Sequence, residues 1–169
     1  MDLEKELLKR QSLVQCNRII KYIGKDETRF ADLMKLFFKG EYRITQHAAW
    51  PMSYCIRQHP FLAKPYFKKF IDRLSDSNAH PATRRNIVRL LQLVEIPKRL
   101  HGKLMDLCFQ FINNPEEAIA VKAFSLGILS KLAEIYPETL AEIKTVIESR
   151  WEFETPAFRS RARKILKQV

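Results

Sequence analysis

The sequence predicts an all-α protein built from repeated helical hairpins, and three observations carry that prediction. Apolar residues recur every three or four positions along almost all of the 169 residues. No segment alternates between apolar and polar residues for long enough to form a half-buried strand. Local markers recur at just under 40 residues, which is a period typical of stacked helical repeats. A composition with 46% apolar residues and only 4 glycines also favours a packed helical core.

Two sets of markers measure the period independently. One is the residue near the start of each second helix, and the other is a proline at the junction between hairpins. The first set is Gln46, Arg85, Lys122 and Arg161, with separations of 39, 37 and 39 residues. The second set is Pro60, Pro97 and Pro137, with separations of 37 and 40 residues. Since glutamine interrupts the basic series in the first hairpin, we expect any cationic stripe to lie toward the C-terminal half.

Helix start and stop signals place the elements between these markers. Residues 2–24 carry apolar residues at helical spacing as far as Gly24, and we expect them to form an N-terminal helical cap. Asp26 is expected to cap the next helix and Gly40 to end it. The helices expected from there on are 27–39, 42–58, 61–75, 82–95, 98–113, 117–136, 138–151 and 157–168. Pro51 lies inside one of them and is expected to bend it, because proline removes an amide donor.

Two later helices are expected to begin with a capping side chain followed by proline. These pairs are Asn114-Pro115 and Thr155-Pro156. An asparagine or threonine oxygen can accept a bond from the first turn, and proline suits the first helical position because its missing amide is not needed there.

The third hairpin resembles HEAT-like repeats of the armadillo type, in which an outer helix, a short Asn-Pro turn and an inner helix opening with Val-Arg form one unit. The residues that carry the resemblance are Asn114-Pro115 and Val121-Lys122-Ala123, with Arg84-Arg85 and Ser160-Arg161 in the equivalent places. The resemblance implies a right-handed α-solenoid of about four HEAT-like helical hairpins. It implies one domain over residues 1–169, with a cap at 2–24 and repeats at 26–59, 61–95, 97–136 and 137–169.

The charge of the chain is strongly basic and unevenly distributed. The net charge is +11, from 30 basic and 19 acidic side chains. Residues 116–155 reverse the sign with 8 acidic and 4 basic side chains, whereas the last fourteen residues carry 5 basic and none acidic. Such a balance permits an acidic partner such as nucleic acid but does not require one.

In a solenoid the second helices line the concave face, so their polar residues are the candidate binding site. The candidates are Arg43, His47, Trp50, Arg85, Arg89, Lys122 and Arg161. Cations spaced along a groove suit phosphate contacts. In the alternative reading, the opening basic residues tie neighbouring repeats together, with Asp76, Asn113 and Asn114 as their partners. His47 beside Trp50 has its own alternative, a packed histidine that covers the proline kink.

These observations favour a non-enzymatic scaffold that binds a protein or peptide on its concave face. A nucleic-acid-binding protein that uses the basic concave stripe is the alternative. A protein similar to the HEAT-like DNA glycosylases that excise alkylated bases is a weaker one, because Trp50 is the only tryptophan on an inner helix and no carboxylate lies in mid-groove.

Cofactors, metals and membranes are not expected. The four histidines lack metal-ligand spacing, and the scattered glycines form no phosphate loop. Cys16, Cys55 and Cys108 lie among apolar neighbours and are expected to be buried, reduced thiols. No apolar run is long enough to span a bilayer, and the first residues lack the pattern of a secretory signal, so we expect a cytoplasmic protein.

Overall fold

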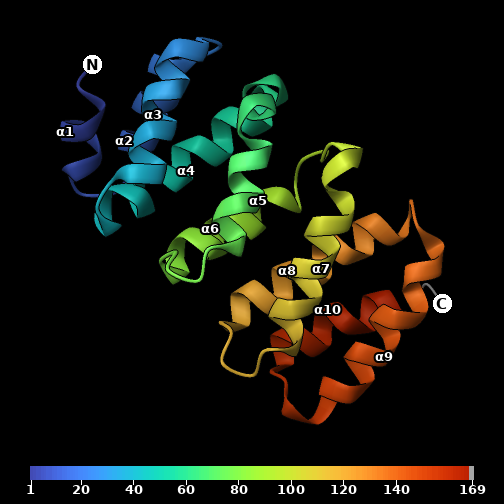
Figure 1. Cartoon of the computed structure of the whole chain (residues 1–169). Helices are drawn as coiled ribbons and strands as arrows, with labels where there is room; N and C mark the ends of the chain where they lie inside the picture. Colours follow the sequence, from blue (N-terminus) through green and yellow to red (C-terminus); the bar gives the residue numbers. More distant parts are fainter. Residues whose placement is uncertain (168–169) are drawn as a thin grey trace. The chain divides into compact units, whose positions relative to one another are not determined.

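The structure of the protein, a computed structural model, describes residues 1–167 and divides into two compact units. The first unit spans Met1–Phe67, and the second begins at Lys68. All regular structure in the described range is helical, without a strand (Figure 1). The predicted fold class, an all-α chain of helical hairpins, is confirmed. The expected repeat boundaries stay predictions.

The first unit packs three helices against a fourth. Helix α4 (Tyr42–Gln58) contacts α1 (Leu3–Leu8), α2 (Leu13–Ile23) and α3 (Glu27–Lys39). Its apolar residues recur at helical spacing, and each is almost fully buried: Ile44, Ala48, Met52, Cys55 and Ile56. A 3₁₀ helix at Pro60–Tyr66 follows α4 and packs against it. The helix continues through Pro51, and the expected bend there stays a prediction.

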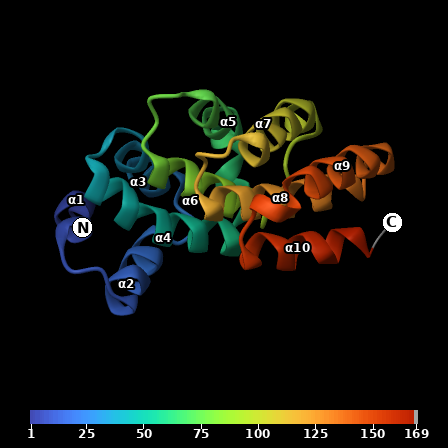
Figure 2. The same cartoon turned by 90° about the horizontal axis from the view of Figure 1, so that it is seen from below.

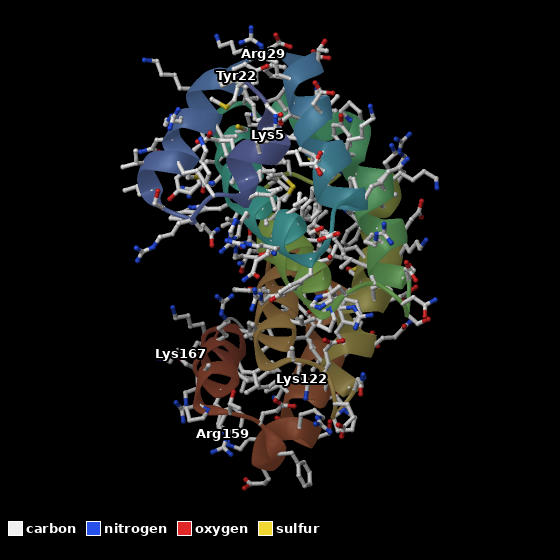
Figure 3. The ribbon with its side chains drawn as sticks, turned by 90° about the vertical axis from the view of Figure 1, so that its left-hand side faces the viewer. Lys5, Tyr22, Arg29, Lys122, Arg159 and Lys167 are labelled. Carbon is white, nitrogen blue, oxygen red and sulfur yellow. The ribbon has the colours of Figure 1, made fainter. Side chains whose placement is uncertain are left out.

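The junction between α2 and α3 forms as the sequence predicts. Gly24 ends α2 with a φ of 50°, a backbone conformation that residues with a Cβ rarely adopt. The Asp26 carboxylate then accepts bonds from the amides of Thr28 and Arg29, which caps α3. The guanidinium of Arg29 lies 4.6 Å from the centre of the Tyr22 ring and donates to the Tyr22 carbonyl (Figure 3). These contacts fix the angle at which the chain enters α3.

The second unit has two layers of helices (Figure 2). One layer holds α5 (Phe67–Ser75), α7 (His101–Asn113) and α9 (Leu140–Arg150). The other holds the second helices of the hairpins, α6 (Pro81–Leu91), α8 (Ile119–Ala133) and α10 (Pro156–Leu166). Because α8 packs against α6, α7 and α10, it is the centre of this unit.

Several expected helices are shorter than predicted or are divided. The segment expected at 61–75 consists of a 3₁₀ helix and α5, because Pro65 lies inside the segment and cannot donate an amide bond to a continuous α-helix. The segment expected at 98–113 opens with a 3₁₀ turn at Lys98–Leu100, and the one expected at 82–95 ends at Leu91. The last expected helix, 157–168, is observed as Pro156–Leu166, and residue 168 lies outside the described residues.

One predicted cap is wrong and the other is confirmed. Asn114 Oδ1 accepts a bond from the Glu116 amide, which closes a turn before the helix instead of capping it. Helix α8 therefore starts later, with Ala118 as its N-cap. Thr155 does cap α10, since its hydroxyl accepts from the Phe158 amide and proline follows at the first helical position.

Candidate functional site

One position near the start of each second helix ties that helix to a neighbouring segment of the chain. The N-caps of α4, α6, α8 and α10 are Glu41, His80, Ala118 and Thr155. Four residues after these N-caps stand Thr45, Arg84, Lys122 and Arg159, with separations of 39, 38 and 37 residues. Each of the four side chains bonds to a neighbouring segment of the chain. We call these four the bracing residues.

Lys122 is the most buried of the bracing residues, with 4% of its surface exposed (Figure 3). Its Nζ lies 2.9 Å from Glu154 Oε1 and 3.3 Å from the Pro115 carbonyl oxygen. The same Glu154 oxygen lies 3.0 Å from Arg150 Nη2. Because a buried charge is tolerated only with a counter-charge, this cluster joins α8 firmly to the segment before α10. Because Lys122 is buried in that contact, its ammonium group is not available to a ligand.

Arg84 makes the equivalent contact one hairpin earlier. Its Nη1 lies 2.7 Å from Glu117 Oε2, and its guanidinium lies 5.1 Å from the centre of the Phe111 ring. Glu117 and Glu154 each stand directly before the N-cap of a second helix. A basic residue of one second helix therefore pairs with a glutamate that directly precedes the second helix of the next hairpin, and this happens twice in succession.

The other two bracing residues bond within their own hairpin. Arg159 Nε donates to the Trp151 carbonyl at 2.9 Å, and its guanidinium lies 5.8 Å from the Trp151 ring (Figure 3). Thr45 Oγ1 donates to the carbonyls of Phe37 and Gly40, each at 3.1 Å. Both contacts tie a second helix to the end of the helix before it.

The predicted series of opening residues was out of register. Gln46 and Arg85 lie five residues after their N-caps and Arg161 lies six after its own, so only Lys122 holds the bracing position. The expected partners of the ladder were also wrong. Asp76 pairs with Arg73 at 3.0 Å, the Asn114 side chain bonds the Glu116 amide, and Asn113 is exposed. The partners of Arg84 and Lys122 are glutamates instead, since a carboxylate compensates the charge of a buried cation.

Three of the predicted site residues belong to the first unit. Arg43 is exposed, and Trp50 is half-buried. His47 is half-buried and its Nδ1 lies 2.6 Å from the Leu7 carbonyl oxygen, to which it donates. His47 therefore holds α1 against α4, which accounts for this histidine without a ligand.

The remaining predicted site residues belong to the second unit. Arg85 and Arg89 of α6 are half-buried, and within residues 1–167 neither has an ion pair or a hydrogen bond. Arg161 of α10 donates from Nη1 to Gln92 Oε1 at 2.9 Å and to the Ala123 carbonyl at 3.3 Å. Its partners are neutral. These three arginines differ from Arg84 and Lys122 in that no carboxylate in the described chain compensates them.

The second helices as a class carry no carboxylate, whereas the first helices do. No aspartate or glutamate lies within the bounds of α4, α6, α8 or α10. The acidic residues of the helices α3, α5, α7 and α9 are Glu27, Asp32, Asp72, Asp106, Glu142 and Glu148. The second helices thus carry no negative charge of their own, and their arginines other than Arg84, which pairs with Glu117, can attract anions.

A rival basic surface lies over α5 and the start of α7, but a carboxylate already occupies it. Asp72 lies 2.6 Å from Lys68 Nζ and 3.3 Å from Lys103 Nζ. The hydrogen bond from Lys68 and the contact with Lys103 lower the pKa of Asp72, so it stays ionised and neutralises both lysines. Arg99 adds one further cation beside them. This hollow attracts anions less than its lysine count suggests.

The cysteines are buried, as predicted, and none has formed a disulfide. Burial raises the pKa of Cys16 to about 11 and those of Cys55 and Cys108 to about 12. At neutral pH each thiol is therefore protonated and unreactive.

We expect native protein to resist thiol-modifying reagents at neutral pH and denatured protein to react at all three cysteines. Because the folded pKa values lie above the unfolded value of 9.0, the protonated thiols stabilise the fold fully below that pH, and this contribution is lost as the pH rises toward 11–12. Mass spectrometry after timed maleimide treatment checks the expectation. Rapid modification of Cys108 in folded protein would contradict it.

Over residues 1–167, no three His, Cys, Asp or Glu side chains gather in a way that would hold a metal ion. No helix in that range is long and apolar enough to cross a membrane.

Comparison with known proteins gives one informative result. A protein family described as HEAT repeat domain matches residues 3–169. The match extends over every helix from α1 to α10. No curated protein and no solved structure matches the chain.

Proposed function

Because the chain belongs to the HEAT repeat domain family, we propose that it is a non-enzymatic scaffold that binds a protein or peptide along its second helices. These helices would line the concave face of the predicted solenoid. The partner we infer is acidic. Proteins of this family are repeat scaffolds that often mediate protein interactions, and the proposal adds the face and the charge of the partner.

The observation that carries the proposal is that some basic residues of the second helices pair with glutamates and others have no carboxylate partner. Arg84 and Lys122 are paired with glutamates, so they brace the stack. Arg85 and Arg89 lie on the same helix as Arg84, yet nothing within residues 1–167 compensates their charge. A half-buried arginine without a carboxylate is a ready partner for an anion, because its guanidinium donates charge-assisted hydrogen bonds.

Nucleic acid is the second candidate partner, supported by the same acid-free helices. A single strand would also need exposed aromatic rings on which its bases can stack. In the second unit Arg161 lies over the Phe124 ring, and Arg159 and Arg163 lie over the Trp151 ring. The exposed ring of Phe153 lies outside the second helices. This favours carboxylates over bases as the ligand. An enzyme that excises alkylated bases is disfavoured because no carboxylate lies within the second helices.

The test is the reversal of charge at Arg85 and Arg89. The double variant Arg85→Glu/Arg89→Glu is titrated with a labelled oligoglutamate peptide, a labelled duplex and a labelled single strand, each at low and moderate salt. We expect the peptide to lose about tenfold or more in affinity, which corresponds to about 1.4 kcal/mol. Lys98→Glu/Arg99→Glu makes the same charge change next to α7 and is the control, since both residues are exposed there.

The outcomes separate the candidates. Loss of peptide binding in the α6 variant alone supports the proposal. If the protein binds the duplex with a steep salt dependence and does not bind the peptide, the partner is nucleic acid and the peptide proposal fails. Equal weakening by both double variants would show that net charge, and not the second helices, attracts the ligand.

A further inference from the structure

Arg161 is held across the middle of the second unit in an unusual way. It belongs to α10, and it donates to Gln92, the C-cap residue of α6. Helix α8 lies between the two, since it packs against both α6 and α10 (Figure 2). The contact between Gln92 and Arg161 therefore passes over α8.

The bridge crosses α8 at its one glycine. A Cβ at Gly127 would lie 2.8 Å from Gln92 Oε1 and 3.1 Å from Arg161 Nη1, which is closer than side chains normally approach. The missing side chain is what lets the amide and the guanidinium meet above the helix. Arg161 is supported from below by the Phe124 ring, whose centre lies 5.2 Å from the guanidinium, and by the Ala123 carbonyl.

The bonds of Arg161 leave its charge uncompensated. Both acceptors are neutral oxygens, and both bonds use Nη1. A guanidinium has five N–H donors in a planar fork, and in the described chain the other donors of Arg161 meet no acceptor. The arginine is thus oriented by a platform and a neutral bridge, with donors left for an anion.

Further cations flank this bridge on the same helices. Arg89 precedes Gln92 by three residues and Arg85 precedes Arg89 by four, so the three share one face of α6. On α10, Lys164 follows Arg161 by three residues and is exposed. The face of α6 that reaches Arg161 therefore carries two more arginines without carboxylate partners.

We propose that Arg161 binds a carboxylate of an acidic partner segment. In the absence of the partner, the Gln92 side-chain oxygen occupies the position that this carboxylate would take. The inference rests on the proposed function and names the partner chemistry of the same face. Gln92 Oε1 occupies the position that a glutamate oxygen would take, because the two side chains have the same shape. A carboxylate displaces the amide, since charge-assisted bonds are roughly twice as strong as neutral ones and a carboxylate can engage the fork with both oxygens.

The first test places a carboxylate beside Arg161 by a substitution at Gln92. In Gln92→Glu the new carboxylate pairs with Arg161 and competes with the partner. We expect the affinity for a labelled oligoglutamate peptide to fall about tenfold, or about 1.4 kcal/mol, with no loss of thermal stability. Gln110→Glu makes the same charge change at an exposed position of α7 and should bind as the unaltered protein does.

A second pair of variants tests Arg161 itself. Arg161→Gln is expected to weaken oligoglutamate binding by a similar factor. Arg163→Gln is the matched control, because it removes one positive charge from the same helix where the guanidinium lies over Trp151. Thermal melts of all four variants show whether each is folded, and Gln92→Glu keeps the proposal testable even if Arg161→Gln unfolds.

The proposal is distinguishable from the proposed function. If Arg85→Glu/Arg89→Glu weakens peptide binding while Gln92→Glu does not, the scaffold stands and the role of Arg161 is overturned. If oligoglutamate binds none of these proteins, both are overturned. If Gln92→Glu weakens binding of a duplex and leaves the peptide unaffected, the site recognises phosphate and the peptide proposal fails.

Discussion

Replacement of Glu154 by alanine is expected to lower the free energy of unfolding by about 3–5 kcal/mol, because it strips the counter-charge from a buried lysine. The carboxylate of Glu154 is 3% exposed and bonds both Lys122 and Arg150. Without it, Lys122 is left almost fully buried with only the Pro115 carbonyl as an acceptor. Urea unfolding of the purified variant, followed by circular dichroism, measures the change.

The neighbouring residue Glu152 provides the control for this prediction. It is exposed and makes no ion pair within the described chain, so Glu152→Ala should change the free energy of unfolding by less than about 0.5 kcal/mol. A Glu154→Ala variant as stable as Glu152→Ala would contradict the bracing role. The double variant Lys122→Met/Glu154→Leu should recover part of the loss, because an apolar pair no longer buries a lone charge.

The second large effect is expected at Phe158, the first large apolar residue of α10. Its side chain is fully buried. Together with Ala162 and Ile165 it forms the buried apolar face of α10, the helix that packs against α8. Phe158→Ala should cost about 3–5 kcal/mol, since it removes a ring from a packed core and leaves a cavity. Thermal and urea unfolding both report the loss.

Phe153 is the matched control, because it is 77% exposed and carries the same ring five residues earlier. The Arg150 guanidinium lies 5.7 Å from the centre of this ring, and the ring itself is mostly exposed, so Phe153→Ala should cost under about 1 kcal/mol. Similar losses in the two variants would mean that α10 is not held by its buried stripe.

Much of the fold follows from local sequence signals. Helical spacing of apolar residues, with the cap at Asp26 and the stop at Gly24, predicts α3 and α4 with their observed bounds. Where the prediction differs, backbone bonds outside the periodic pattern decide. Pro65 divides one segment, and the turn that Asn114 closes delays the start of α8. The spacing of apolar residues predicts neither the division of the helix nor the delayed start.

The candidate site was predictable only in part, because similar basic residues take opposite roles. Adjacent arginines at 84 and 85 differ by one helical position, which turns Arg84 toward a glutamate of the next hairpin and leaves Arg85 without one. One sequence signal does mark the brace. In this signal a bracing glutamate stands five residues before the basic bracing residue of the helix that follows it. Glu117 precedes Lys122 in this way, and Glu154 precedes Arg159. The bridge over Gly127 joins residues 69 apart in sequence, and no local pattern reports it.

The most direct test of the proposed binding face is a map of amide chemical shifts as oligoglutamate is added to isotope-labelled protein. The second-helix face predicts changes in the second unit at Arg85, Arg89, Gln92 and Arg161, with α5, α7 and α9 unaffected. Changes centred on α5 and α7, where Lys68 and Lys103 flank Asp72, would contradict it.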